Sequence, residues 1–360
     1  MAVLSARARW LVPVVAAAAV AATGGALALA ASAAPALPPK SAAQLLTDLQ
    51  RANLTPFSGT IVQTASLGLP ALPKNGKATD LTDLVSGSNT LRLWYGGPDK
   101  VRVALLGTLG ESDVIRNGRD VWTWDSNQNS YTHQSIDPGK KDSETRVGTP
   151  QQAAEDALAL VGRSTTVTTD GTAQVAHRKA YELVLSPKDS RSLVGQVRIA
   201  VDAELSVPLR VRVFARNAAK PSFEVGFTQV SFSAPGGEHF TFTPPRGSHQ
   251  AKSGGLPIGR LPVDPGQLDP NSVGQRGEAV STASKVIGEG WTKVAVVPVG
   301  EDLDASTLGA VLSGLPRVSG PWGTGRLFSG PLFSAVLTDD GRLAVGAVAP
   351  ELIYQALGHK

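Results

Sequence analysis

The residues that could do chemistry are few and scattered. Asp339-Asp340-Gly341 offers two carboxylates to a calcium ion, but no further acidic residues follow at ligand spacing, so these residues predict a hairpin turn. There is no H-E-x-x-H, G-x-S-x-G, Walker A or G-x-G-x-x-G motif. The histidines are too far apart in the sequence to suggest clustered metal ligands: His133, His177, His239, His249 and His359. We therefore predict no metal, no cofactor and no enzyme activity.

Two tryptophans are the side chains best suited to contact a ligand. Trp122 and Trp124 alternate within Val121–Asp125, which places them on one face of a strand. Asn117-Gly118 precedes them and predicts a tight hairpin, because both residues tolerate positive φ. We expect the two tryptophans to pack in a core or a cavity wall, because aromatic side chains bury a large area. A stacking site for a polar ligand is the less favoured alternative, since no paired carboxylates lie nearby for sugar chemistry.

Composition narrows the class of protein. The chain has 360 residues and no cysteine, which excludes disulfides, thiolate chemistry and a lipid-modified cysteine. The net charge of +4 falls to about +2 without Arg7 and Arg9, and this small excess does not predict nucleic-acid binding.

The N-terminus has the features of an export signal. Arg7 and Arg9 precede an apolar run from Leu11 to Ala31, and Ala31-Ser32-Ala33 provides a cleavage site. We predict a signal peptide over residues 1–33 and an extracytoplasmic location, in the cell envelope or secreted. The alternative is an uncleaved anchor, because the apolar run is long enough to span a bilayer.

Residues 41–162 are expected to contain two helices and one unusually long loop. Ser41 and Gln44 fit a capping box that begins a helix running to about Ala52. Thr149 with Pro150 begins a second helix, which ends at Gly162. Residues 66–86 form a long leucine-rich insertion, which is either a loop folded onto the core or a mobile flap over an apolar cavity.

Alternating apolar residues predict a large antiparallel sheet with one apolar face. The expected strands are Phe57–Ala65, Asn89–Tyr95, Lys100–Leu106, the strands around Trp122, Val167–Thr169, Gln174–Ser186, Val194–Val201, Pro208–Ala215 and Ser222–Ser231.

The last third of the chain predicts a linker and a second unit. A first domain over 41–248 is followed by a linker over 249–274, rich in Gly, Pro and Ser, and by a small α+β domain over 275–360. The expected elements of the small domain are helices at Ala279–Ile287 and Ala305–Leu312, a strand at Thr292–Val297, a hairpin of Arg326–Thr338 with Arg342–Val348, and a helix from about Pro350.

Several motifs together resemble the LolA-like superfamily, which includes periplasmic lipoprotein carriers and RseB-type sigma-factor regulatory proteins. The matching residues follow one another in order: Phe57-Ser58-Gly59, Asn117-Gly118-x-x-Val121-Trp122-x-Trp124-Asp125, Tyr181–Pro187, Val201-Asp202, and Phe240-x-Phe242-x-Pro244-Pro245. The resemblance covers about residues 41–248. It implies a mainly β (α+β) fold, a curved antiparallel half-barrel with a helical lid. The second domain favours the RseB-type branch.

The resemblance leaves two functions open. In the first, the protein holds acyl chains of a lipid or lipoprotein in an apolar concavity, as a carrier or envelope sensor. In the second, it is a regulator that docks on a membrane protein such as an anti-sigma factor. The predicted ligand-binding residues for the first function are Leu91, Leu93, Val103, Trp122, Trp124, Leu183, Leu185, Val211, Val213 and Phe227.

Overall fold

The computed structural model describes residues 37–52, 55–68, 86–97, 99–107, 110–135, 164–251, 285–298 and 314–358. The predicted export signal, the helix of residues 149–162, the helix of residues 305–312 and most of the 66–86 insertion lie outside these residues.

Twelve strands of the described chain form one sheet in the order β12-β6-β5-β4-β3-β2-β1-β11-β10-β9-β8-β7. Neighbouring strands are antiparallel, except that β12 runs parallel to β6. The strands are β1 (Phe57–Ser66), β2 (Ser86–Gly97), β3 (Lys100–Leu106), β4 (Glu111–Asn117), β5 (Asp120–Asp125), β6 (Ser130–Ser135), β7 (Thr165–Val175), β8 (Arg178–Pro187), β9 (Val194–Asp202), β10 (Pro208–Ala215), β11 (Phe223–Ser231) and β12 (His249–Gln250).

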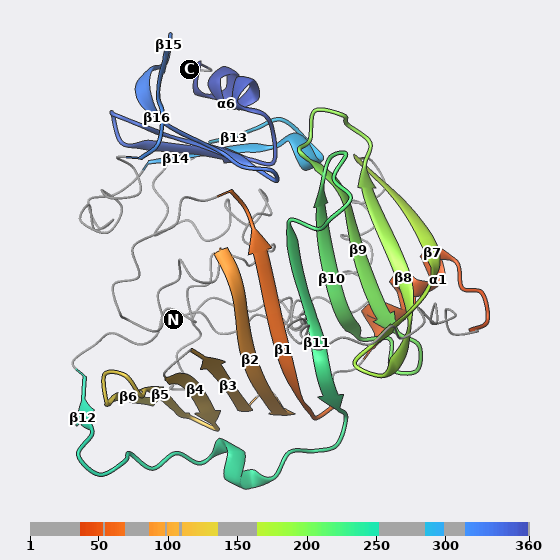
Figure 1. Cartoon of the computed structure of the whole chain (residues 1–360), viewed down its shortest axis with the longest axis vertical. Coiled ribbons are helices and arrows are strands. Elements are labelled where there is room, and N and C mark those ends of the chain that lie inside the picture. Colours follow the sequence, from red (N-terminus) through yellow and green to blue (C-terminus); the bar gives the residue numbers. More distant parts are fainter. Residues whose placement is uncertain are drawn as a thin grey trace, which may run out of the picture.

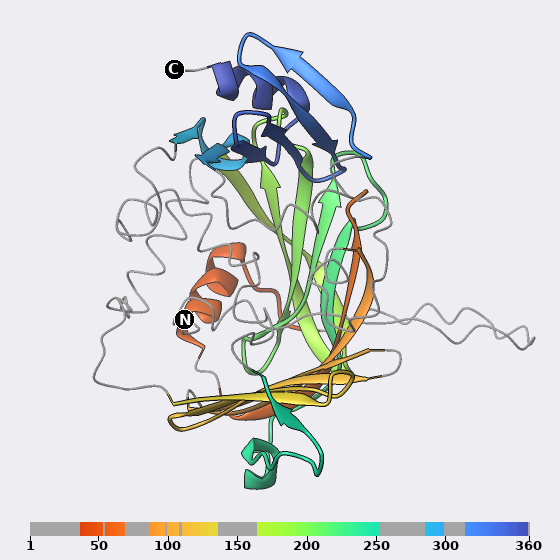
Figure 2. The ribbon, with the colours of Figure 1, turned by 90° about the vertical axis from the view of Figure 1, so that its left-hand side faces the viewer.

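The large sheet is curved and open, and the segments that flank it lie on opposite sides. Helix α1 (Ala42–Arg51) lies in the concavity, whereas the short helix η2 (Gly237–Phe240) lies outside the convex face (Figure 2). The two edge strands of the sheet are β7 and β12, so it does not close into a barrel (Figure 1). This architecture confirms the predicted fold class, a curved antiparallel half-barrel with a helix over its mouth.

Two hydrophobic cores pack on the large sheet. In the first, Phe57 packs against Tyr95 and Phe227, with ring centroids 5.6 and 5.9 Å apart. Gly59 lies beneath this cluster, where a Cβ atom would come within 2.5 Å of Cε1 of Phe227, so the close approach of the ring requires glycine. In the second core, Leu45 of α1 is buried on β8.

The C-terminal residues form a second sheet with its own core. Its strands run in the order β13-β14-β18-β17-β16-β15 among the described residues, with the helix α6 packed on them. These elements are β13 (Lys285–Ile287), η4 (Gly290–Thr292), β14 (Val294–Pro298), β15 (Arg317–Gly320), β16 (Gly323–Ser329), β17 (Ser334–Thr338), β18 (Arg342–Gly346) and α6 (Pro350–Gly358). Val336, Val348 and Ile353 are fully buried at the centre of this core.

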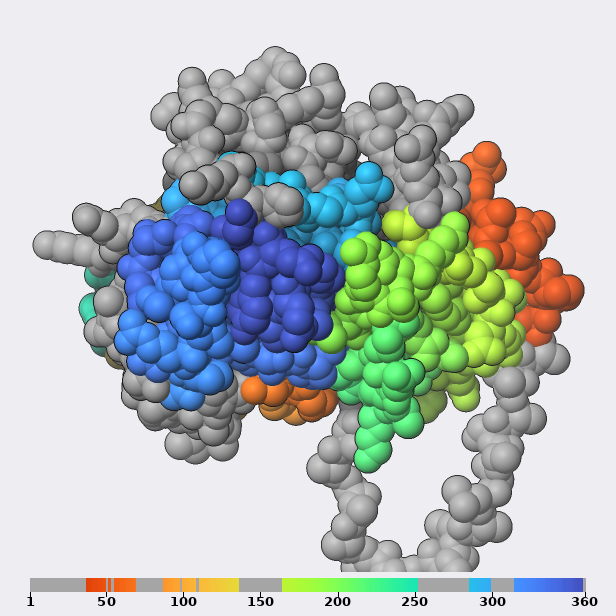
Figure 3. Space-filling view, turned by 90° about the horizontal axis from the view of Figure 1, so that it is seen from above, coloured from red at the N-terminus to blue at the C-terminus, as the bar shows by residue number. Residues whose placement is uncertain are grey.

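The second sheet sits directly against one end of the large sheet (Figure 3). The backbone N–H of Leu193, in the β8–β9 turn, donates to the carbonyl oxygen of Ala347 over 2.8 Å. The indole N–H of Trp291 donates to the Thr165 hydroxyl, also over 2.8 Å. These bonds join the two sheets through a turn and a strand end.

Several predicted elements need correction. The predicted strand Gln174–Ser186 is a hairpin, because Ala176 and His177 both adopt positive φ (49° and 64°) and turn the chain. Residues 285–287, predicted to be helical, form β13 instead, because they pair with β14. The predicted strand Arg326–Thr338 is two strands, since residues 330–333 turn the chain between β16 and β17.

Candidate functional site

Eight of the ten predicted ligand-binding residues lie on the concave face of the large sheet. The strand registers align them with other apolar residues in rows that cross the sheet. One row contains Leu183, Ile199, Val211 and Val225, and the adjacent row contains Leu185, Val197, Val213 and Phe223. Two further rows contain Phe227, Ile61, Leu91 and Leu105, then Leu93, Val103 and Val114.

These rows are only partly covered by the described residues. Leu93, Leu183 and Phe227 are buried, but Leu91, Val103, Leu185, Val211 and Val213 are half-buried. An apolar surface that is continuous over several strands and incompletely covered is suited to hold an apolar ligand without any specific polar contact.

Helix α1 covers one end of the concave face. The Ser41 hydroxyl accepts from the N–H of Gln44, and the Gln44 side chain accepts from the N–H of Ser41, so the predicted capping box is present. The cap starts the helix where Leu45 can pack on Tyr181 and Leu183. The Tyr181 hydroxyl donates to the carbonyl of Pro38 over 2.8 Å, which ties the segment before the helix to β8.

Trp122 and Trp124 do not share the surface of the other eight residues, and this corrects the register inferred from the sequence. Val103 pairs with Val114 and Val114 with Thr123, so the tryptophans, which alternate with Thr123, point to the convex face. Their contribution to ligand binding remains a prediction, but any such ligand would lie on the opposite side of the sheet.

The convex position of the tryptophans has a physical reason. The segment that follows β11 lies over them, with the Phe242 ring centroid 5.4 Å from that of Trp122 and 5.9 Å from that of Trp124. Trp122 also stacks on His133 at 4.0 Å. Both faces of the β4–β5 hairpin therefore carry apolar side chains, and alternation alone does not identify the concave one.

The convex face also carries an ionic cluster on β8, β9 and β10. The Glu182 carboxylate, whose side chain is 6% exposed, accepts from Arg198 (3.0 Å), Arg210 (3.0 Å) and Arg212 (2.6 Å). Burial acts to raise the pKa of Glu182, but the charge of Arg212 and the hydrogen bonds from Arg198 and Arg210 outweigh it, so this pKa is lowered. Nothing in the sequence but the alternation of arginines with apolar residues pointed to this cluster.

Two kinds of feature are absent from the described residues. No group of three or more His, Asp or Glu residues among them is placed to hold a metal ion. Within the same residues, no helix combines the length and apolar character needed to cross a bilayer.

Comparison with known proteins gives matches among solved structures alone. No protein-family model and no curated protein sequence matches the chain. A chain of the MucA/MucB complex from Pseudomonas aeruginosa is 17% identical, and the alignment covers 88% of this chain and 96% of that chain with a TM-score of 0.44. A LolA superfamily protein from Nitrosomonas europaea is 11% identical, with 57% and 99% covered and a TM-score of 0.22.

Proposed function

We propose that the protein is an extracytoplasmic binding protein that holds acyl chains of a lipid or lipoprotein on the concave face of its large sheet. The observation that carries this proposal is the set of cross-strand apolar rows, in which five of the eight predicted ligand-binding residues are half-buried. A ligand that covers Val211, Val213 and Leu91 would remove apolar surface from water on both sides of the contact.

The energetics of acyl binding suit such a surface. Each buried CH₂ group contributes about 0.8 kcal/mol, so the affinity grows with chain length and needs no precisely placed polar partner. Leu183 and Leu185 belong to the hydrophobic cluster that α1 forms with β8, whereas Val211 and Val213 are outside this cluster. We therefore place the acyl chain along β10, β11, β1 and β2.

The test is a titration of lipid-extracted full-length protein with a fluorescent fatty acid. We expect saturable binding with a micromolar or tighter Kd. Val211→Asp should weaken it at least about tenfold, because the acyl chain would have to desolvate a carboxylate. Val62→Asp is the matched control, since Val62 is also half-buried but points to the opposite face of β1. Absence of saturable binding, or equal loss in both variants, would contradict the proposal.

A second candidate function is docking on a membrane protein, such as an anti-sigma factor. The observation that favours it is the edge strand β15, which pairs with β16 on one side and has no strand on the other among the described residues. Such an edge can accept an extended segment of a partner as an added strand. Ser319→Pro would remove a backbone donor from this edge, because the Ser319 N–H points away from β16. It should therefore abolish recovery of the partner from membranes while leaving fatty-acid binding unchanged.

A further inference from the structure

A cavity of about 300 Å³ lies on the convex face, on the opposite side of the sheet from the apolar rows. It opens between β9, β10 and the loop that follows β10. The register pairs Gln196 with Phe214 and Arg198 with Arg212, so these four side chains project from the same face. Because alternate residues of a strand face the same side, both β9 and β10 contribute two side chains to the cavity.

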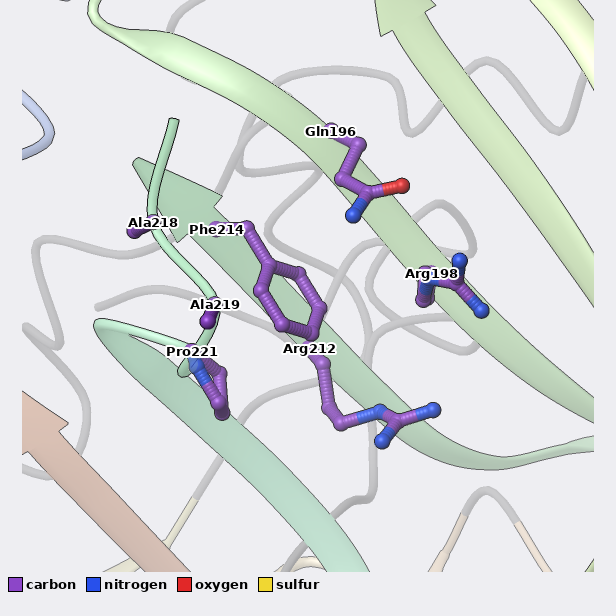
Figure 4. Close-up of a pocket in the computed structure, with 7 residues that line it drawn as sticks. All are labelled: Gln196, Arg198, Arg212, Phe214, Ala218, Ala219 and Pro221. Atoms are coloured by element: carbon purple, nitrogen blue, oxygen red, sulfur yellow. The ribbon is translucent and has the colours of Figure 1, made fainter. Parts of the chain in front are cut away.

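The cavity has an apolar end and a cationic end. Figure 4 shows the Phe214 ring at its centre, with Ala218, Ala219 and Pro221 on one side. The guanidinium groups of Arg198 and Arg212 lie on the other side, away from Ala218 and Ala219. A ligand that fits both ends carries a negative charge next to a small apolar group.

The arginines of the cationic end are only partly neutralised by direct contacts. Arg198, Arg210 and Arg212 share the Glu182 carboxylate, and Arg198 also pairs with Asp170 over 2.6 Å. Three guanidinium groups thus share two carboxylates in ion-pair contact. Glu224 lies opposite Arg212 across the strand pair but forms no ion pair with it in the described part of the chain.

Two donors of the cluster lack an acceptor. The Nε atoms of Arg210 and Arg212 are buried and have no hydrogen-bond partner among the described residues. A buried donor without an acceptor is costly, more so on a charged group, and calls for a partner. Of these two arginines only Arg212 lines the cavity, and the two oxygens of a ligand carboxylate would match the planar fork of its guanidinium group.

We infer that this cavity binds an acidic side chain of a peptide, whose carboxylate contacts Arg198 and Arg212 and whose small apolar neighbour packs on Phe214 and Pro221. A carboxylate carries a single charge, which matches the one positive charge left when three guanidinium groups share two carboxylates better than a doubly charged phosphate does. The partner of this chain would therefore present an acidic segment to the convex face. This site is independent of the acyl-binding face.

The probe is a short labelled peptide of alternating glutamate and alanine, titrated into the full-length protein and followed by fluorescence anisotropy. Ala219→Glu places a carboxylate in the cavity without touching the ionic cluster, and Ala219 is exposed, so the fold tolerates it. We expect Ala219→Glu to weaken peptide binding at least about tenfold, because like charges at an interface cost several kcal/mol. The neutral Ala219→Gln should stay within about twofold of the unchanged protein.

Three results would overturn the inference. They are absence of peptide binding to the unchanged protein, equal binding by the two Ala219 variants, and displacement of the peptide by inorganic phosphate or anionic vesicles at lower concentration than by unlabelled peptide. Both Ala219 variants should keep fatty-acid binding. Loss of peptide binding with retained fatty-acid binding therefore separates this site from the proposed function.

Discussion

Glu182 holds three arginines together on the convex face, and Glu182→Gln should destabilise the protein strongly. The substitution keeps the shape of the side chain but removes the charge that holds Arg198, Arg210 and Arg212. Removing one partner from a buried ion pair costs about 3–5 kcal/mol. The arginine side chains here remain 22–24% exposed, so we expect the lower end, about 3 kcal/mol.

The loss should depend on pH in a defined direction. The pKa of Glu182 is lowered from its ordinary value of 4.5. The stabilisation is therefore complete above pH 4.5 and is lost as the pH falls through the folded-state pKa. The difference in unfolding free energy between Glu182→Gln and the unchanged protein should be about 3 kcal/mol at pH 7 and should shrink steadily in acid.

The assay is urea unfolding of both proteins across this pH range, with the melting temperature as a second measure. A loss of about 3 kcal/mol in a domain of about 200 residues lowers Tm by about 6–12 °C. Glu224→Gln is the control, because Glu224 lies on the same face without an ion pair to Arg212, and it should cost less than about 0.5 kcal/mol. Equal losses for the two variants, or a loss independent of pH, would refute the reasoning.

Three further predictions concern the concave core and the convex aromatic layer. Ser41→Ala removes the capping hydroxyl of α1 and should cost about 1 kcal/mol, measured as faster amide exchange in that helix, whereas unchanged exchange would contradict it. Leu183→Ala deletes a fully buried side chain and should cost about 2–5 kcal/mol in chemical unfolding; a loss under 1 kcal/mol would show that the site is not packed. Phe242→Ala uncovers Trp122 and Trp124 and should shift tryptophan emission to longer wavelength, and an unshifted spectrum would mean that Phe242 does not cover them.

The sequence predicts local structure well where a pattern and a signal coincide. Ser41 and Gln44 mark the start of α1, and alternation of Val197, Ile199 and Val201 or of Val211 and Val213 correctly places each set on one face. Prediction from the sequence fails where the pairing of strands determines the local structure. Ala176 and His177 form a hairpin turn without glycine or asparagine, because β7 and β8 pair on both sides of them.

The candidate site is predictable only in part for the same reason. Alternation shows that Trp122 and Trp124 share a face, but the face is set by the pairing of β3 with β4 and by the later segment that brings Phe242 over it. The cavity beside Arg198 and Arg212 was not predicted, since it needs the β10–β11 loop to fold next to Phe214. Such contacts join residues whose proximity no local pattern encodes.

The central claim, that the concave face holds an acyl chain, is tested most directly by photocrosslinking. A fatty acid with a photoreactive group near its terminal methyl is bound to lipid-extracted full-length protein, and the labelled peptides are identified by mass spectrometry. We predict labels on the concave residues of β1, β2, β10 and β11, such as Ile61, Leu91, Val211 and Val225. Labels confined to convex residues such as Val62 and Arg92, or no specific label, would contradict the claim.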